Sequence, residues 1–160
     1  MVTVRQKEDI AAKVRNVETT CKEGTYVEVK TETNHTFATD EPIPAGGQDK
    51  AAAPLMYLGG ALASCQSVQI TKVAEAMRFE HGTINIKCST TTDFLTSAHE
   101  DKPVMRFCAA ELIIDLETNE SEKKTERLKA VAEDRCPVGR LFADAGYPPV
   151  LVWNILPMPS

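Results

Sequence analysis

The feature that most constrains the fold is a long helical pattern of small and apolar residues near residues 52–78. The pattern begins at APLMYLGGALASCQS, where Pro54 suits the first helical turn because its missing N–H group needs no partner there. Gly59 and Gly60 lie inside the pattern, although each glycine costs a helix about 1 kcal/mol relative to alanine. We therefore expect a central, buried helix whose Gly59–Gly60 face packs closely on another helix.

The segment before this helix has the features of short strands and a loop. Val27 and Val29 alternate with polar residues, which is the period of a half-buried strand. The run Lys22-Glu23-Gly24 predicts a hairpin turn, because glycine readily supplies a positive φ. Three prolines and a Gly-Gly pair then predict a loop over EPIPAGGQDKAAAP.

The segment after the helix alternates strands and helices. We expect strands over 82–94, 103–118 and 148–157, an amphipathic helix over 119–135 and a short helix over 136–147. A bulge near Ala109-Ala110 resets the register of the second strand, and Asn119 with Glu122 forms a capping box. This order predicts an α+β fold in one domain over 1–160, with residues 1–16 as an N-terminal arm or helix.

Composition excludes several classes of function. The chain has 160 residues, a net charge of −5 and 42% hydrophobic residues, so it has no basic excess for binding nucleic acid. No run reaches the roughly 18–20 apolar residues of a membrane span, and the N-terminus lacks the apolar stretch of a secretory signal. We expect a cytoplasmic protein, without nucleic-acid or membrane partners, whose thiols are kept reduced.

Metal and cofactor sites are not expected. No CxxC pair occurs, and the three histidines, His35, His81 and His99, lack the spacing of metal ligands. Five cysteines are spread along the chain: Cys21, Cys65, Cys88, Cys108 and Cys136. Of these, we interpret Cys21, Cys88 and Cys108 as structural or incidental.

Cys136 and Cys65 are the candidate reactive residues. Cys136 directly precedes Pro137 at a helix start, so its thiol should lie over free N–H groups that favour thiolate, with Arg135 and Arg140 adding positive charge. The alternative is that Cys136 is a small apolar N-cap, because buried free cysteine is common. Cys65, taken alone, has the usual setting of a core cysteine.

Taken together, two segments resemble the OsmC/Ohr family, the osmotically inducible and organic-hydroperoxide-resistance proteins. They are PLMYLGGALASCQSVQI, which holds Cys65, and CPVGRLF, which begins at Cys136. The preceding HTFATDEPIPAGGQDKAAAP is also similar to the approach to this helix in OsmC-like proteins, and the resemblance covers roughly residues 26–155. It implies antiparallel sheets wrapped around long central helices in an interlaced homodimer.

The resemblance also implies a two-cysteine peroxidase that reduces organic hydroperoxides in oxidative-stress defence. Cys65 would be the peroxidatic residue, whose attack on the peroxide converts it to sulfenic acid. Cys136 would then form a disulfide with Cys65, and a cellular dithiol would reduce that disulfide. We therefore expect the two cysteines to approach within disulfide reach. The polarised thiol inferred for Cys136 is compatible with either cysteine attacking first.

Two positions depart from the family pattern. Active members carry a glutamate just after the proline equivalent to Pro54, where this chain has Leu55 and Met56. They also use an early-strand arginine, where this chain has only Lys30, which cannot form a bidentate fork. Three readings stay open: a weakened peroxidase, a protein of the same fold that binds a small apolar or thiol ligand, and a structural or stress-associated dimer.

Overall fold

The computed structural model describes residues 13–99 and 101–159. The chain divides into two compact units, one ending at Pro54 and the other starting at Leu55. The prediction that residues 1–160 act as one domain concerns how these units combine, and it stays a prediction. Most of the expected N-terminal arm lies outside the described residues, and residues 13–16 form neither helix nor strand.

The N-terminal unit is a three-stranded antiparallel sheet in the order β1-β2-β3. Its strands are β1 (Val17–Glu23), β2 (Tyr26–Thr31) and β3 (Thr36–Thr39). The predicted first turn is confirmed: Gly24 has φ +61°, a conformation that glycine adopts without a steric penalty. A short 3-10 helix, η2 (Ile43–Ala45), follows in the proline-rich loop.

Asp40 organises that loop from within. Its side chain is 1% exposed, and its carboxylate accepts hydrogen bonds from the Thr25 hydroxyl (2.7 Å) and from the backbone N–H groups of Glu41, Gln48 and Lys50. These hydrogen bonds, with that of Thr25 contributing most, hold the pKa of Asp40 below its ordinary value. The loop that the sequence predicts before α1 is therefore held together by hydrogen bonds to one carboxylate, that of Asp40.

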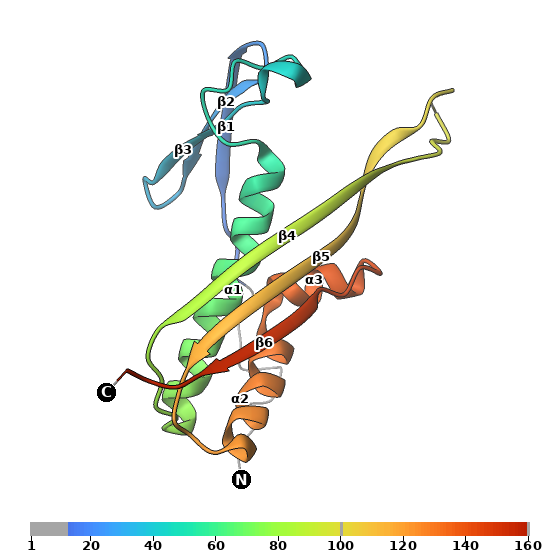
Figure 1. The fold of residues 1–160 in the computed structure, drawn as a ribbon. Coiled ribbons are helices and arrows are strands. Elements are labelled where there is room, and N and C mark those ends of the chain that lie inside the picture. The colour runs from blue at the N-terminus through green and yellow to red at the C-terminus, as the bar shows by residue number, and fades with distance from the viewer. Residues whose placement is uncertain (1–12, 100, 160) are drawn as a thin grey trace. The chain divides into compact units, whose positions relative to one another are not determined.

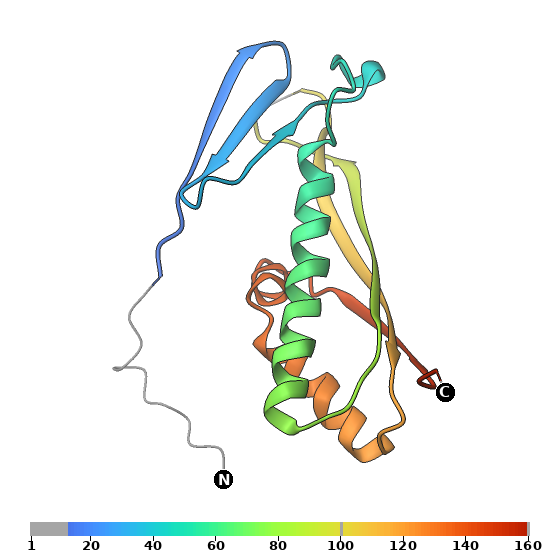
Figure 2. The ribbon, with the colours of Figure 1, turned by 90° about the vertical axis from the view of Figure 1, so that its left-hand side faces the viewer.

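The C-terminal unit places three helices on one face of a second sheet. Its elements are α1 (Pro54–Met77), β4 (Ile84–Leu95), β5 (Val104–Glu117), α2 (Glu122–Arg135), α3 (Pro137–Asp144) and β6 (Val150–Leu156). The sheet order is β4-β5-β6, and α1, α2 and α3 lie on the same side of it (Figures 1 and 2). Among the described residues, no helix is both long enough and apolar enough to cross a membrane.

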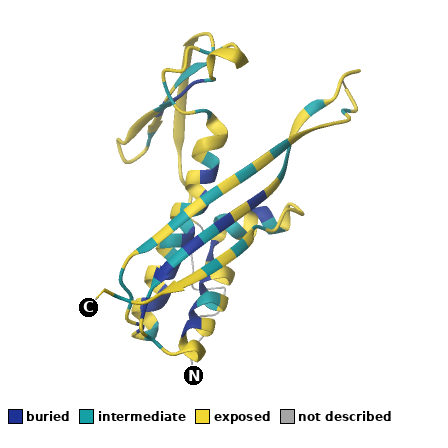
Figure 3. Ribbon diagram, viewed as in Figure 1, coloured by how far each residue is buried: buried dark blue, intermediate teal, exposed yellow. Residues whose placement is uncertain are grey.

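The core of this unit lies between the sheet and the helices (Figure 3). The central strand β5 contributes every second residue from position 110 to 116, all of them buried, as its period-2 pattern predicts. The main residues of the core are Ala110, Leu112, Ile114 and Leu116 from β5, Leu62, Ile70, Val73 and Ala74 from α1, Leu128 and Ala132 from α2, and Phe142 from α3.

The predicted α+β fold is confirmed, with one difference in the sheets. β4 pairs antiparallel with β5, but β6 pairs with β5 in parallel, starting at Val150 opposite Glu111. The reason is the connection: α2 and α3 carry the chain back along the sheet before β6 begins, as a crossover must for a parallel pair.

A β-bulge in β5 lies next to its predicted position. Thr91 pairs with Ala109 and Thr92 pairs with Phe107, so Cys108 is the extra residue. The bulge shifts the alternation by one and lets Phe107 pack on the core, where its ring lies edge-on to that of Phe142 at 4.9 Å.

One local prediction, the capping box of Asn119 with Glu122, is wrong. The N-cap of α2 is Ser121 rather than Asn119, and its side chain makes no capping hydrogen bond. Asn119 Oδ1 instead accepts a hydrogen bond from the backbone N–H of Met158. Local capping propensity is overridden here by a tertiary contact with the chain that leaves β6.

The glycine pair in α1 does not pack on another helix of this chain. A methyl group added at Gly59 would lie 3.5 Å from Thr90 and 3.7 Å from the Cys88 sulfur, so Gly59 faces β4 at ordinary van der Waals distance. At Gly60 an added methyl group would meet no atom of the described chain within 4 Å. The helix is thus buried on one side only, not all round.

Candidate active site

Cys65 and Cys136 both lie in the C-terminal unit, close enough for the Cys65 side chain to affect the pKa of the Cys136 thiol. Cys65 stands in the middle of α1, and Cys136 stands at the junction of α2 and α3. Both thiols are free. The two cysteines are therefore neighbours, although they come from helices far apart in the sequence, and their approach within disulfide reach stays a prediction.

The position of Cys136 follows from the proline after it. A residue before proline is disfavoured in the α conformation, and Cys136 is extended, with φ −78° and ψ 104°. It therefore ends α2 and caps α3, where Pro137 takes the first position. The backbone N–H of Gly139 donates to the Cys136 sulfur at 3.4 Å, as expected for a thiol at a helix start.

The electrostatic setting of Cys136 differs from the one predicted. Burial raises the pKa of its thiol, the Gly139 N–H lowers it, and the Cys65 side chain raises it further, so the net direction is upward. The predicted thiolate preference at the helix start is real but smaller than the desolvation. Arg135 and Arg140, which were expected to add positive charge, are not among the causes of this shift. The Arg140 guanidinium instead pairs with Asp144 at 3.2 Å.

The two sulfurs differ in access. Cys136 is fully buried, whereas Cys65 is half-buried. Cys65 is consequently the thiol of the pair that a small molecule from solvent reaches more easily.

The other three cysteines stand apart in the fold, on different strands. Cys88 faces the core from β4 and burial raises its pKa, Cys108 occupies the bulge of β5, and Cys21 donates to the Gly24 carbonyl oxygen at 3.4 Å. In the part of the chain that the structure describes, no group of three or more His, Cys, Asp or Glu side chains is arranged to hold a metal ion.

The residues that replace the expected acid and arginine are all exposed. Leu55 is 40% exposed and Met56 is 71% exposed, both in the first turn of α1. Lys30 is exposed on β2 of the N-terminal unit. The two cysteines are thus present in this chain, without the glutamate and arginine of the family pattern.

Sequence reasoning missed Gln66, the residue after Cys65. Gln66 is 2% exposed, and its Nε2 has no hydrogen-bond partner in the described structure. The signal that could have found it is its spacing: Gln66 lies four residues from both Leu62 and Ile70, on the buried face of α1. A polar residue among core positions of a helix is uncommon and needs an explanation.

Comparisons with known proteins agree with this picture. The sequence model of the OsmC-like protein family matches residues 47–149. A search of curated proteins finds no significant match. Among solved structures, an OsmC-like protein from Mycoplasma pneumoniae superposes with a TM-score of 0.74 at 13% identity, covering 93% of this chain and 100% of that one.

Two further structures carry more specific names. An organic hydroperoxide resistance protein OsmC from Legionella pneumophila has a TM-score of 0.66 at 16% identity, over 92% of this chain and 99% of that one. An organic hydroperoxide resistance protein from Elizabethkingia anophelis has a TM-score of 0.69 at 14% identity, over 92% and 99%. Identities this low establish a shared fold, and with the family match over most of the sequence they lead to one conclusion: the chain belongs to the OsmC-like protein family.

Proposed function

We propose that this protein is a thiol-dependent peroxidase that reduces organic hydroperoxides, with Cys65 as the attacking residue and Cys136 as the resolving residue. The observation that carries the proposal is the proximity of the two free thiols, seen in the effect of the Cys65 side chain on the pKa of Cys136, because a two-cysteine cycle needs such a pair. The family membership and the names of the Legionella and Elizabethkingia relatives point to the same substrate class.

The reaction proceeds in three balanced steps. The Cys65 thiolate attacks the distal oxygen of the hydroperoxide, the O–O bond breaks, and the departing alkoxide takes a proton and leaves as the alcohol. The Cys136 sulfur then attacks the sulfenic sulfur of Cys65, forming a disulfide and releasing water. A cellular dithiol finally reduces the disulfide by two thiol–disulfide exchanges and becomes oxidised itself.

Burial supports this order of attack. Cys65 is half-buried, and Cys136 is fully buried with a raised pKa, so Cys136 stays protonated in the resting protein. Once Cys65 is oxidised, Cys136 is the neighbouring thiol that can attack its sulfur.

We expect turnover below that of a relative with the full family pattern. Leu55 and Met56 have no carboxylate to replace the glutamate of the family pattern. Lys30 carries a positive charge, but its ammonium group cannot form the bidentate hydrogen bonds of an arginine. This departure also supports the second candidate function, a protein of the same fold that binds a small apolar or thiol ligand without efficient peroxidase activity.

The protein is further proposed to act as a homodimer in the cytoplasm, where dithiol reductants are available. α1 leaves a face of small and apolar residues exposed to solvent: Gly60, Ala61, Ser64 and Val68. Small residues allow another helix to approach closely, and a second copy of α1 is the partner that the family resemblance implies.

One assay separates the two candidate functions. Cumene hydroperoxide consumption is measured with dithiothreitol for the wild-type protein and for Cys65→Ser, Cys136→Ser and, as a matched control, Cys88→Ser. A peroxidase loses dithiol-linked turnover in the first two variants and keeps it in the third. Equal, slow consumption by the wild-type protein and Cys65→Ser would contradict the peroxidase and leave the ligand-binding and structural readings.

A further inference from the structure

The two cysteines of the proposed cycle differ in how a reductant can reach them. Cys136 is 0% exposed, whereas Cys65 is half-buried on α1. In thiol–disulfide exchange the attacking group must reach the sulfur that it attacks, so access decides which half of a disulfide is opened. The first step of the proposed cycle already requires that a hydroperoxide reach Cys65 from solvent, and a reductant can use the same approach.

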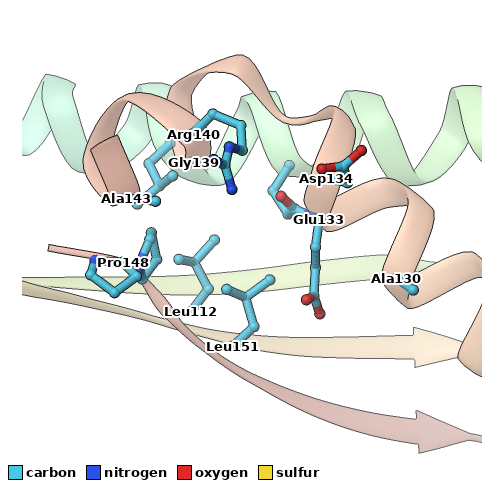
Figure 4. A pocket seen from close by; sticks show the side chains of 12 residues that line it. Leu112, Ala130, Glu133, Asp134, Gly139, Arg140, Ala143, Pro148 and Leu151 are labelled. Carbon is cyan, nitrogen blue, oxygen red and sulfur yellow. The ribbon is translucent and has the colours of Figure 1, made fainter. Parts of the chain in front are cut away.

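A cavity beside Cys136 gives no second route to its sulfur. The cavity has a volume of about 410 Å³, and Figure 4 shows Gly139 of α3 on its wall, across from Leu112 and Leu151 of the sheet. Leu62 and Gly139 line this cavity, but Cys136 does not. A methyl group added at Gly139 would lie 3.5 Å from the Cys136 sulfur and 4.0 Å from Leu62, so these two residues form the wall on the side of the sulfur.

The same contacts place the sulfur of Cys136 near the other cysteine. Leu62 lies on α1 three residues before Cys65, and residues with this spacing share a face of a helix. The start of α3 therefore lies against the turn of α1 that carries Cys65, which agrees with the influence of Cys65 on the Cys136 thiol.

The acidity of Cys136 does not redirect the attack. The backbone N–H of Gly139 donates to the Cys136 sulfur at 3.4 Å, and this hydrogen bond stabilises the charge that a departing thiolate carries. Burial acts in the opposite direction, because it raises the pKa of Cys136 and a less acidic thiol leaves more slowly. A slower departure lowers the rate of the step, but it does not open a path to a sulfur that solvent cannot reach.

We propose that the reductant attacks the Cys65 sulfur of the oxidised pair, so that the mixed disulfide forms on Cys65 and Cys136 departs as the thiolate. This inference rests on the proposed two-cysteine cycle and specifies its last step. The thiolate of the reductant bonds to Cys65 Sγ, the Cys65–Cys136 bond breaks, and its electron pair goes to the Cys136 sulfur, which takes up a proton. The second thiol of the reductant then attacks the reductant's own sulfur in the mixed disulfide and releases Cys65, so the dithiol is oxidised and the protein is reduced.

Sulfite can identify the attacked sulfur, because it bonds to that sulfur and releases the other one as a thiolate. The disulfide is first formed in the full wild-type chain with diamide and is verified by peptide mapping. The oxidised protein is treated briefly with excess sulfite at neutral pH, the reaction is stopped with acid, the sulfite is removed, and free thiols are alkylated with N-ethylmaleimide in denaturant. Mass spectrometry should find the S-sulfonate on Cys65 about tenfold more often than on Cys136.

Three controls test whether the fold directs the attack. The same disulfide treated with sulfite in guanidinium should lose the preference, because both sulfurs are then exposed to solvent. Leu62→Ala, measured where circular dichroism shows it to be folded, should increase the S-sulfonate on Cys136 by opening its sulfur toward the cavity. Leu55→Ala makes the same substitution at an exposed position of α1 and should keep the wild-type ratio.

The outcomes separate this inference from the cycle on which it rests. An S-sulfonate found mainly on Cys136, or equally on both cysteines of the folded protein, would overturn the order of reduction and leave the two-cysteine cycle intact. A ratio that is unchanged in guanidinium would also overturn it, because the fold would then not direct the attack. Failure of diamide to form the disulfide would contradict the cycle itself, and this inference with it.

Discussion

The Cys65 side chain lies close enough to Cys136 to raise the pKa of its thiol, and of the two residues only Cys136 is fully buried. This relationship joins the middle of a long helix to the start of a short one. It arises because α2 ends and α3 begins at Cys136-Pro137, and because the start of α3 lies near Leu62 of α1. Because the two thiols are neighbours, experiments should test their chemistry as a pair rather than one thiol at a time.

The first prediction concerns oxidation of the pair. One equivalent of cumene hydroperoxide should give a Cys65–Cys136 disulfide in the wild-type protein, detected by mass spectrometry of proteolytic peptides. In Cys136→Ser, Cys65 should stop at sulfenic acid and be trapped by dimedone, since no resolving thiol is in contact. Cys65→Ser should show neither product at position 136, whereas Cys88→Ser should behave as the wild-type protein. Absence of the disulfide in the wild-type protein would contradict the proposed cycle.

The second prediction concerns stability at high pH. Burial raises the pKa of Cys136 in the folded state, so the unfolded thiol ionises first as pH rises. The stabilisation is present below the ordinary thiol pKa of about 8.5 and is lost as pH rises from there toward the folded value. The free energy of unfolding in guanidinium should therefore fall between pH 7 and pH 10, and it should fall less in Cys136→Ala.

Cys88 provides the internal comparison for that experiment. Burial raises its pKa as well, so Cys88→Ala should also flatten the decline, and the double variant should flatten it further. Cys21 is exposed, and Cys21→Ala should leave the pH dependence as it is. A decline of equal slope in the wild-type protein and the double variant would assign it to other groups.

The third prediction concerns Asp40 and the loop before α1. Its hydrogen bonds, led by that of Thr25, lower its folded pKa, so the stabilisation is present above the unfolded value of about 3.9 and is lost as pH falls through the folded value. Asp40→Asn replaces one acceptor oxygen by a donor that faces N–H groups. Hydrogen exchange at the Gln48 and Lys50 amides should become faster in this variant.

Asp49→Asn is the matched control, because Asp49 is exposed in the same loop and its φ of +56° is one that asparagine tolerates. Exchange at Gln48 and Lys50 should stay at the wild-type rate in this control. Unchanged exchange in Asp40→Asn would show that the loop does not depend on the carboxylate.

Local pattern was sufficient to predict many of the elements. The period-2 alternation of β5 and the extended cap at Cys136, directly before Pro137, depend on neighbouring residues, and both are confirmed. The bulge was also expected one residue from where it occurs, because the apolar pattern of β5 changes phase there. Such features follow from backbone sterics and side-chain periodicity.

Features set by distant contacts were not predictable in the same way. The parallel pairing of β6 depends on the path of α2 and α3, and the raised pKa of Cys136 depends on how far packing removes the thiol from water. The role of Gly59 depends on Cys88 and Thr90 of β4. Gln66 was missed because its environment is known only once α1 is docked on the sheet.

The last prediction concerns association through the exposed face of α1. Val68 is 46% exposed on this face, and an added methyl group at Gly60 would meet no described atom within 4 Å. Burial of this apolar surface against a second copy would stabilise a dimer, since the hydrophobic effect scales with the apolar area removed from water. Sedimentation at micromolar concentration should therefore give twice the chain mass of 17.5 kDa.

Val68→Glu tests the same face directly. It places a carboxylate where a second apolar surface would exclude water, so the sedimenting species should shift toward 17.5 kDa, while circular dichroism stays that of the folded chain. Arg127→Glu is the matched control, because it also changes charge at an exposed helical position, on the polar α2, and it should leave the dimer intact. A wild-type protein that sediments at 17.5 kDa would contradict the dimer, and a Val68→Glu protein that remains dimeric would move the interface away from this face of α1.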